Sequence, residues 1–319
     1  MLKAEFVHKT FRPARSFGQE LWSLLKKDTR EDGVKAVRGL NLEVRQGEIL
    51  GLVGESGSGK STLGRLLGGL YEPDQGQVTY EGRNLATMTR AQKIGFFQKV
   101  QFMFQDPASA LNPRLTAEAA LSEGLIIHHL GQRAQRREKA QRLLAEVGLE
   151  PAMANRYPHQ FSGGQRQRLG LARALSLDPE ILVADEPASS LDVSIQAQII
   201  NLLLDLKEKR GLTLVLISHD LPLVALLADR VAVMYGGLLM EIMPRNLLGQ
   251  LQHHPYVQAL WASTLGQEDY ILTGEPPDPQ NPPPGCPFEP RCPEAKPICL
   301  TPPPMKSQEP DRFWACHAR

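Results

Sequence analysis

An eight-residue stretch, Gly54-Glu55-Ser56-Gly57-Ser58-Gly59-Lys60-Ser61, has residue types and a spacing suited to binding phosphate. It fits the pattern G-x-x-x-x-G-K-[S/T], in which glycines let the backbone curl so that successive N–H groups point at phosphate oxygens. At this spacing Lys60 can reach the β- and γ-phosphates of a nucleoside triphosphate, and the Ser61 hydroxyl can ligate Mg²⁺. A glycine-rich turn with a chance lysine is the alternative interpretation.

The residues on either side of this phosphate loop favour the binding site over the chance turn. Residues 49–53 are apolar and predict a short buried strand, and the residues from Thr62 to Leu70 predict a helix. The amino end of that helix, with Thr62 in its first turn, adds partial positive charge beside the loop. The sequence therefore predicts that the chain binds a nucleoside triphosphate.

Polar residues also close three other predicted strands. They are Gln105, the adjacent carboxylates Asp185 and Glu186, and His219. Each of them alone is compatible with an ordinary capping or surface residue. Because all four end strands in a chain that also has a phosphate loop, we interpret them as one site at the ligand edge of a sheet.

These side chains suit the transfer of a phosphoryl group to water, which needs a metal, an aligned water and charge stabilisation. Asp185 is expected to hold Mg²⁺, directly or through water, and Glu186 to polarise the attacking water. His219 is expected to hydrogen-bond the γ-phosphate and Glu186, and Gln105 to touch both Mg²⁺ and the water.

A second surface suited to anions follows about 100 residues after the loop. Ser162, Gly163, Gly164 and Gln165 stand at the start of a predicted helix. Their N–H groups and the helix dipole favour phosphate by the same logic as the loop. Since one loop already serves one ATP, this segment suggests contact with the ATP of another subunit.

The composition is that of a globular protein without a basic footprint. The chain has 319 residues, 42% of them hydrophobic and 22% charged, with a net charge of +1. A near-neutral balance gives no argument for nucleic acid. No signal peptide is recognised, and no stretch approaches the roughly 18 apolar residues of a membrane span. We expect about two domains in a reducing cytoplasm, acting at a membrane only through partners.

Predicted helices and strands alternate through the middle of the chain. Apolar runs predict strands at 77–80, 100–104, 181–184 and 212–217, and helical patterns cover 117–149 and 194–209. This alternation predicts an α/β fold with a parallel sheet and right-handed crossovers. Two more strands are expected earlier, an edge strand at 2–8 and a second strand at 34–45.

Two segments interrupt this pattern. Residues 12–33 form a basic insertion, for which one apolar face packed down is favoured over an amphipathic helix that touches lipid or a partner. Residues 274–285 are proline-rich and predict an extended linker.

All four cysteines follow that linker. They are Cys286, Cys292, Cys299 and Cys316, with five, six and sixteen residues between neighbours. Closely spaced cysteines in a cytoplasmic chain indicate metal binding, and the spacing alone suits zinc as well as an iron–sulfur cluster. Four unliganded thiols in a mobile tail are the further alternative.

Taken in order, these motifs resemble the ATPase subunit of an ABC transporter. The resemblance covers about residues 34–240 and rests on the phosphate loop, Gln105, Ser162-Gly163-Gly164-Gln165, Asp185-Glu186, Ser190-Leu191-Asp192 and His219. Ser190 departs from the alanine common in that family. Other stretches are similar to the oligopeptide/dipeptide importer subfamily, namely Phe104-Gln105-Asp106-Pro107, Arg156-Tyr157-Pro158-His159, His254-Pro255-Tyr256 and Gly285-Cys286-Pro287-Phe288.

The resemblance implies a P-loop NTPase of the ABC type. Such a fold is α/β and has a mixed-sheet core, an antiparallel β subdomain and a helical subdomain, here at about 108–175. It implies a nucleotide-binding domain at 1–245 and a small cysteine-rich extension at 246–319, which holds the linker and the four-cysteine metal site.

The resemblance also implies how the site is completed. Two ATPase subunits close head to tail on two ATP molecules, so that Ser162-Gly163-Gly164-Gln165 of each covers the γ-phosphate held by Lys60 of the other. Asp192 then helps to link the two sites, and Phe11 is expected to stack on adenine. Residues 105–114 would receive a coupling helix of a membrane subunit, and the cysteines would hold a [4Fe–4S] cluster, favoured over Zn²⁺.

The function implied is ATP hydrolysis, with ATP and Mg²⁺, that drives import of di- or oligopeptides from the cytoplasmic face of the membrane. The partners implied are a second ATPase subunit, by preference a paralogue, two transmembrane permeases and, indirectly, an extracytoplasmic peptide-binding protein, with no nucleic acid. One alternative is a soluble ABC-type ATPase that acts on DNA or ribosomes. Another is an importer of nickel, glutathione or oligosaccharide.

Overall fold

The computed structural model describes residues 1–12, 33–106, 110–189, 191–249, 253–264, 272–309 and 311–319. Its strands are β1 (Leu2–Phe11), β2 (Val34–Val44), β3 (Ile49–Val53), β4 (Gln75–Tyr80), β5 (Arg83–Asn84), β6 (Val100–Met103), β7 (Ile181–Asp185), β8 (Thr213–Ser218), β9 (Arg230–Tyr235), β10 (Leu238–Pro244), β11 (Met305–Glu309) and β12 (Arg312–Ala315). Its α-helices are α2 (Lys60–Leu67), α3 (Arg90–Lys99), α5 (Ala117–Ile127), α6 (Arg133–Glu146), α7 (Gly163–Ala174), α8 (Val193–Arg210), α9 (Leu221–Leu227) and α10 (Pro255–Thr264).

A mixed eight-stranded sheet forms the centre of the molecule. Its order is β11-β12-β10-β9-β3-β8-β7-β6, and the strands from β9 to β6 are parallel neighbours. Strands of a parallel sheet are covered on both faces and read as continuous apolar runs. Every residue of β7 and of β8 is buried. The predicted α/β fold with a mixed-sheet core is therefore confirmed.

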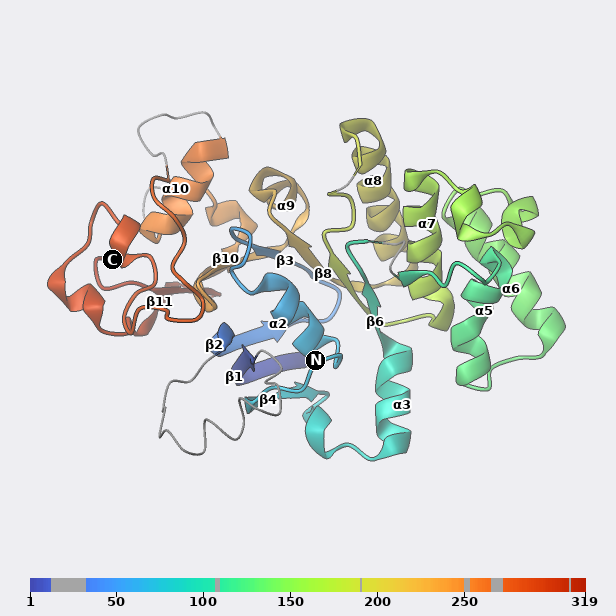
Figure 1. Ribbon diagram of the computed structural model, residues 1–319, viewed down its shortest axis with the longest axis horizontal. Helices are drawn as coiled ribbons and strands as arrows, with labels where there is room; N and C mark the ends of the chain where they lie inside the picture. The colour runs from blue at the N-terminus through green and yellow to red at the C-terminus, as the bar shows by residue number, and fades with distance from the viewer. Residues whose placement is uncertain (13–32, 107–109, 190, 250–252, 265–271, 310) are drawn as a thin grey trace, which may run out of the picture.

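Two apolar layers cover the two faces of this sheet. Because side chains alternate along a strand, Leu182 of β7 packs into one layer and Val183 into the other. The first layer includes residues of α5, α6, α7 and α8, and the second includes α2 and the smaller sheet. Figure 1 shows α5 to α8 grouped at one end and β1, β2 and β4 below the central sheet.

The smaller sheet is antiparallel and has the order β2-β1-β4-β5. The prediction that residues 2–8 form an edge strand is wrong, because β1 pairs with β2 on one side and β4 on the other. The register Leu2↔Tyr80 joins segments far apart in the sequence, and such a contact leaves no trace in a local pattern.

Several helices are preceded by residues whose side chains accept hydrogen bonds from the first turn. Thr116, Ser162, Asp192 and Asp220 each do so, at the starts of α5, α7, α8 and α9. The helical pattern predicted over 117–149 is divided into α5 and α6, and Gly131, with a φ of 64°, lies in their connection. None of the helices in the described residues is both long and apolar enough to cross a bilayer.

The C-terminal extension is built into the sheet. Strand β12 pairs with β10 through Glu241↔Trp314, and β11 continues the sheet beyond it. The proline-rich segment lies along β2, where the Lys35 N–H donates to the Pro279 carbonyl at 2.8 Å. Neither β9, β10 nor the β11–β12 hairpin was predicted. The predicted insertion at 12–33 lies, from residue 13 to residue 32, outside the described residues.

Glu241 connects β10 to the extension at a fully buried position. Its Oε1 accepts from Arg312 Nε at 3.1 Å and lies 3.0 Å from His253 Nδ1. Its Oε2 accepts from the His254 N–H at 2.8 Å. A buried carboxylate is tolerated only with such partners, so this group fixes how the extension sits on the sheet.

Replacing Glu241 with alanine should lower the free energy of unfolding by about 3–5 kcal/mol, because it leaves buried partners uncompensated. Glu43, whose carboxylate pairs with Lys3 at 3.0 Å on the surface, is the matched control. Glu43→Ala should change the same quantity by about 1 kcal/mol or less. Urea denaturation of both variants measures the difference, and equal losses would contradict the role given to Glu241.

Candidate active site

The phosphate loop joins the carboxyl end of β3 to the amino end of α2. Lys60, Ser61 and Thr62 are the first three residues of that helix, and Ser56 and Gly57 face solvent. Gly59 has a φ of 101°, and a Cβ there would lie 2.1 Å from the Ala36 carbonyl oxygen. Only glycine has both the conformation and the space for this position.

The Lys60 side chain folds over the loop. Its Nζ donates to the carbonyl oxygens of Gly54 at 2.7 Å and of Glu55 at 2.9 Å. Burial lowers the pKa of Lys60, so an anion beside it would offset the cost of keeping it charged. The Ser58 hydroxyl is buried without a hydrogen-bond partner among the described residues. Both features fit a phosphate group.

Ser61 and Asp185, the residues predicted to hold Mg²⁺ together with Gln105, contact each other. The Ser61 hydroxyl donates to Asp185 Oδ1 at 2.9 Å, and Asp185 is 1% exposed. Burial raises the pKa of Asp185, against the effect of the Ser61 hydrogen bond. A divalent cation would compensate the buried carboxylate, and the oxygen donors are those that Mg²⁺ prefers.

The Glu186 carboxylate lies between two side chains from neighbouring strand ends. Gln105 Nε2 donates to its Oε2 at 2.9 Å, and His219 Nδ1 lies 3.1 Å from its Oε1. The structure thus brings together the three residues expected to catalyse hydrolysis. The side-chain amide of Gln105, expected to touch Mg²⁺ and water, is directed at Glu186 instead.

The backbone at Glu186 is in an unusual conformation. Its φ is 45°, in the left-handed region that side chains other than glycine rarely adopt. A hydrogen bond from the Glu186 N–H to the Ile217 carbonyl, at 2.9 Å, holds it there. The strain accompanies a side chain aimed across the sheet edge, a pattern found at functional sites.

The second anion surface lies away from the loop of its own chain. Figure 1 places α7 among the helices at one end of the molecule, apart from α2. Ser162 and Gly163 are exposed, and Ser162 Oγ accepts from the Gln165 N–H at 3.3 Å while Gln165 Oε1 accepts from the Ser162 N–H at 3.0 Å. Gly164 lies one residue further along α7.

Asp192 begins α8 and is exposed, beside Val193, which is 83% exposed. Ser190, which precedes them in the same motif, lies outside the described residues. In the described part of the chain, no hydrogen bond or ion pair joins Ser162 or Asp192 to the chain's own phosphate loop.

Phe11, the residue expected to stack on adenine, ends β1. Its ring meets that of Tyr71 edge to face, with 5.4 Å between centroids. The stacking of Phe11 on adenine stays a prediction.

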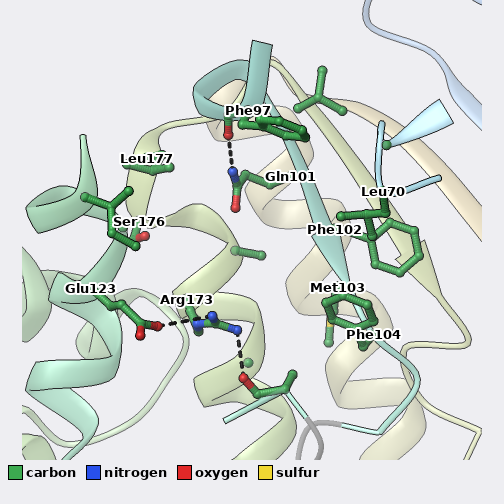
Figure 2. Close-up of a pocket in the computed structure, with 17 residues that line it drawn as sticks. Leu70, Phe97, Gln101, Phe102, Met103, Phe104, Glu123, Arg173, Ser176 and Leu177 are labelled. Atoms are coloured by element: carbon green, nitrogen blue, oxygen red, sulfur yellow. Dashed lines mark hydrogen bonds and ion pairs between the residues drawn. The ribbon is translucent and has the colours of Figure 1, made fainter. Parts of the chain in front are cut away.

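A groove opens between β6 and the helices α5 and α7. Its volume is about 200 Å³, and its lining is largely apolar (Figure 2), with Leu70, Phe97, Gln101, Phe102, Met103, Phe104, Ile127 and Leu177 among the residues. Arg173 crosses its floor, donating to the Ala110 carbonyl at 2.8 Å and to Glu123 at 3.2 Å. The sequence predicted residues 105–114 as the contact for a coupling helix of a membrane subunit. It did not indicate that residues of α5 and α7 line a groove beside this segment, because only folding brings them together.

The four cysteines lie near one another in the extension. Cys286, Cys299 and Cys316 are buried and Cys292 is partly exposed. Burial, with the charges of the other three thiols, raises the pKa of Cys286 to about 11. Within the described residues, however, no group of three or more His, Cys, Asp or Glu side chains is arranged to hold a metal ion. The predicted metal site gains no support from this arrangement.

Comparisons with known proteins give consistent matches. A family model described as ABC transporter matches residues 37–189, and one described as oligopeptide/dipeptide transporter, C-terminal region, matches residues 240–299. The putative oligopeptide transport ATP-binding protein YkfD of Bacillus subtilis is 49% identical over 294 residues, 89% of each chain. The oligopeptide transport ATP-binding protein AppF of the same organism is 48% identical over the same share.

Among solved structures, the dimer of the ATP-binding cassette MJ0796 in a post-hydrolysis state, bound to ADP and Pi, is similar. It is 30% identical, with a TM-score of 0.66, and the match covers 77% of this chain and 99% of that one.

Replacing Gly59 with alanine should weaken ATP binding by about tenfold or more, because the added Cβ would displace the loop backbone. Gly47→Ala is the control, since Gly47 also has a positive φ, of 74°, but has no atom within 4 Å of an added Cβ. That variant should lose only about 1 kcal/mol of stability and keep its affinity. Calorimetric titration with ATP measures the affinity of each variant. Equal affinities for the two variants would contradict the role given to Gly59 in the phosphate loop.

Proposed function

Because the chain belongs to the family of ABC transporter ATP-binding proteins of the oligopeptide/dipeptide type, we propose that its ATP hydrolysis powers the import of di- or oligopeptides through membrane permeases. The proposal for the substrate is supported by relatives named for oligopeptide transport, at 49% and 48% identity. These names do not favour an ATPase that acts on DNA or ribosomes.

The observation that carries the proposed ATP hydrolysis is the position of the Glu186 carboxylate between Gln105 and His219, one residue from Asp185. In the proposed mechanism Glu186 polarises the attacking water. Gln105, through the 2.9 Å bond to Oε2, and His219, at 3.1 Å from Oε1, hold the carboxylate in one orientation. With Nδ1 directed at Glu186, the other ring nitrogen of His219 is available for the γ-phosphate.

The phosphate loop binds the substrate's phosphates in this mechanism. Lys60 exchanges the carbonyl oxygens of Gly54 and Glu55 for phosphate oxygens, and the N–H groups at the start of α2 face the same anion. Ser61 and Asp185 would hold Mg²⁺, which would supply positive charge beside the phosphates. The loop residues Ser56, Gly57 and Ser58, together with Thr62, complete the contact surface, and Glu55, whose N–H and carboxylate bond Tyr256 and Arg291, shapes the loop.

A second ATPase subunit completes each site. This is supported by the exposure of Ser162, Gly163 and Asp192 on a part of the surface away from the chain's own loop, and by the dimeric state of MJ0796. In a head-to-tail pair, the Ser162 end of α7 meets the γ-phosphate held by the partner's loop. We propose a paralogue as that partner.

The groove of Figure 2 is the proposed docking place of a permease helix. It has apolar walls, a charged floor and exposed aliphatic side chains, including Ile127, which is 66% exposed. Docking there would hold the chain, as a peripheral subunit, at the cytoplasmic face of the membrane. An extracytoplasmic binding protein would deliver peptide to the two permeases.

For the extension at 246–319, we propose a [4Fe–4S] cluster at the four cysteines, with Zn²⁺ as the alternative. Four soft thiol donors, three of them buried, support the proposal, while their present arrangement does not form a metal-binding group. Loading would therefore require the thiols to converge further, and no step of ATP hydrolysis depends on it.

Glu186→Gln should abolish turnover while leaving ATP affinity within about threefold, because the amide keeps the shape but cannot polarise water. The expected loss in kcat is about 100-fold or more. Glu150→Gln, at an exposed position, is the control and should hydrolyse ATP at the original rate. An unimpaired rate in Glu186→Gln would remove Glu186 from the mechanism.

Ile127→Glu should release the chain from its permeases, since a charge would be buried in the groove without a partner. Leu226→Glu, which changes a residue 71% exposed on α9, should leave the complex intact. Pull-down of permeases from gently solubilised membranes measures this, at unchanged ATP affinity. Retention of the permeases by Ile127→Glu would contradict docking at this groove.

Oxygen-free purification tests the cysteine site. The expected result is about four iron and four acid-labile sulfide per chain, both lost in Cys286→Ser. Zinc without sulfide would replace the cluster by the alternative, and a chain with neither would refute a metal at these cysteines.

A further inference from the structure

The extension reaches the phosphate loop directly, at Glu55. The Glu55 N–H donates to the Tyr256 hydroxyl of α10 at 3.0 Å. The Glu55 carboxylate accepts from Arg291 Nη1, at 2.9 Å to Oε2 and 3.2 Å to Oε1. Two residues of the extension thus hold both the backbone and the side chain of the loop's second residue.

Arg291 is itself fixed by further contacts. Its Nη1 donates to the Tyr235 hydroxyl at 2.8 Å, and its Nε donates to the Thr273 carbonyl at 2.9 Å. The guanidinium lies 5.7 Å from the Tyr235 ring and 6.0 Å from the Phe288 ring, and the side chain is 7% exposed. A buried, multiply bonded guanidinium has little freedom, so it transmits its position to Glu55.

Tyr256 is equally fixed from behind. Its ring packs with those of Tyr235 and Phe288, at centroid distances of 4.5 Å and 5.3 Å, and is fully buried. Its N–H donates to His254 Nδ1 at 3.1 Å, and the His254 N–H donates to Glu241. Packing against Tyr235 and Phe288 and the link through His254 to β10 therefore fix the position of the hydroxyl independently of the loop that it contacts.

We propose that Arg291 and Tyr256 are positioning residues for ATP, which hold the phosphate loop in its binding conformation through Glu55. Glu55 is fixed by its N–H and its carboxylate, which leaves the N–H groups of Gly57, Gly59, Lys60 and Ser61 for the ligand, while the Ser58 N–H donates to the Glu55 carbonyl at 3.2 Å. A loop released at Glu55 would populate its binding conformation less often, and the apparent affinity falls in proportion to that population. This inference rests on the proposed ATP hydrolysis at the same site.

Loss of the contact between Arg291 and Glu55 should weaken ATP binding and leave the rate of the chemical step nearly unchanged. Arg291→Gln should raise the KM and the Kd for ATP by about tenfold, and kcat should stay within about twofold because Glu186, Gln105 and His219 are untouched. Glu55→Gln should act alike, and the double variant should be no worse than either single one. Arg291→Lys, which keeps the charge facing Glu55 but cannot reproduce the bonds of the guanidinium to Tyr235 and Thr273, should recover only part of the affinity.

Arg230→Gln is the matched control. Arg230 is nearly as buried as Arg291, at 8% against 7% exposed, and also donates to a carboxylate, but that carboxylate belongs to Glu48, at the end of β3 away from the phosphate loop. A merely structural role for Arg291 would make the two variants alike, with lower stability and unchanged KM. The Kd is measured by calorimetry on the full chain, and KM and kcat on the complex extracted from membranes.

Unchanged KM and Kd in Arg291→Gln would overturn the inference while leaving ATP hydrolysis standing. If the unsubstituted chain neither bound nor hydrolysed ATP, the proposed function would fail and the inference with it. Should Arg291→Gln fail to fold, Tyr256→Phe carries the same test by removing one hydroxyl, and an unchanged Kd there overturns the inference equally.

Discussion

The parallel register of β3, β8, β7 and β6 is the constraint on which the active site depends. It pairs Val53 with Ser218, Asp185 with Ile217, and Met103 with Ala184, so the four strands end at one level. The phosphate loop, His219 and Glu186 follow those ends directly, and Gln105 follows after one intervening residue. A shift of one residue would turn these side chains to the other face of the sheet.

Much of this edge could be predicted from the sequence, because a buried parallel strand is a local pattern and its terminal residue is known once the strand is. Asp185, Glu186 and His219 were found in this way. The amide of Gln105 meeting Glu186, and the left-handed backbone at Glu186, depend on contacts between strands. The interior position of β1, the strands β9 and β10 and the β11–β12 hairpin likewise depend on pairing across long sequence distances.

The contacts of the extension could not be predicted from the sequence either. Proline-rich composition predicted a linker, whereas the segment lies along β2 and leads to Arg291, which holds Glu55. No pattern in the sequence couples position 291 to position 55. The phosphate loop and the exposed start of α7 lie on different parts of the surface, as the proposed head-to-tail pair of ATPase subunits requires. The contact of the extension with Glu55 is then the proposed route by which the rest of the molecule acts on the loop.

The most direct test of this account is the composition of the complex that the chain forms in its own cell. The Glu186→Gln variant would be tagged and purified from gently solubilised native membranes in ATP and Mg²⁺, and its companions identified by mass spectrometry. Two polytopic membrane subunits and a second ATPase subunit are expected. A soluble homodimer with nucleic acid or ribosomes, and no membrane protein, would contradict it.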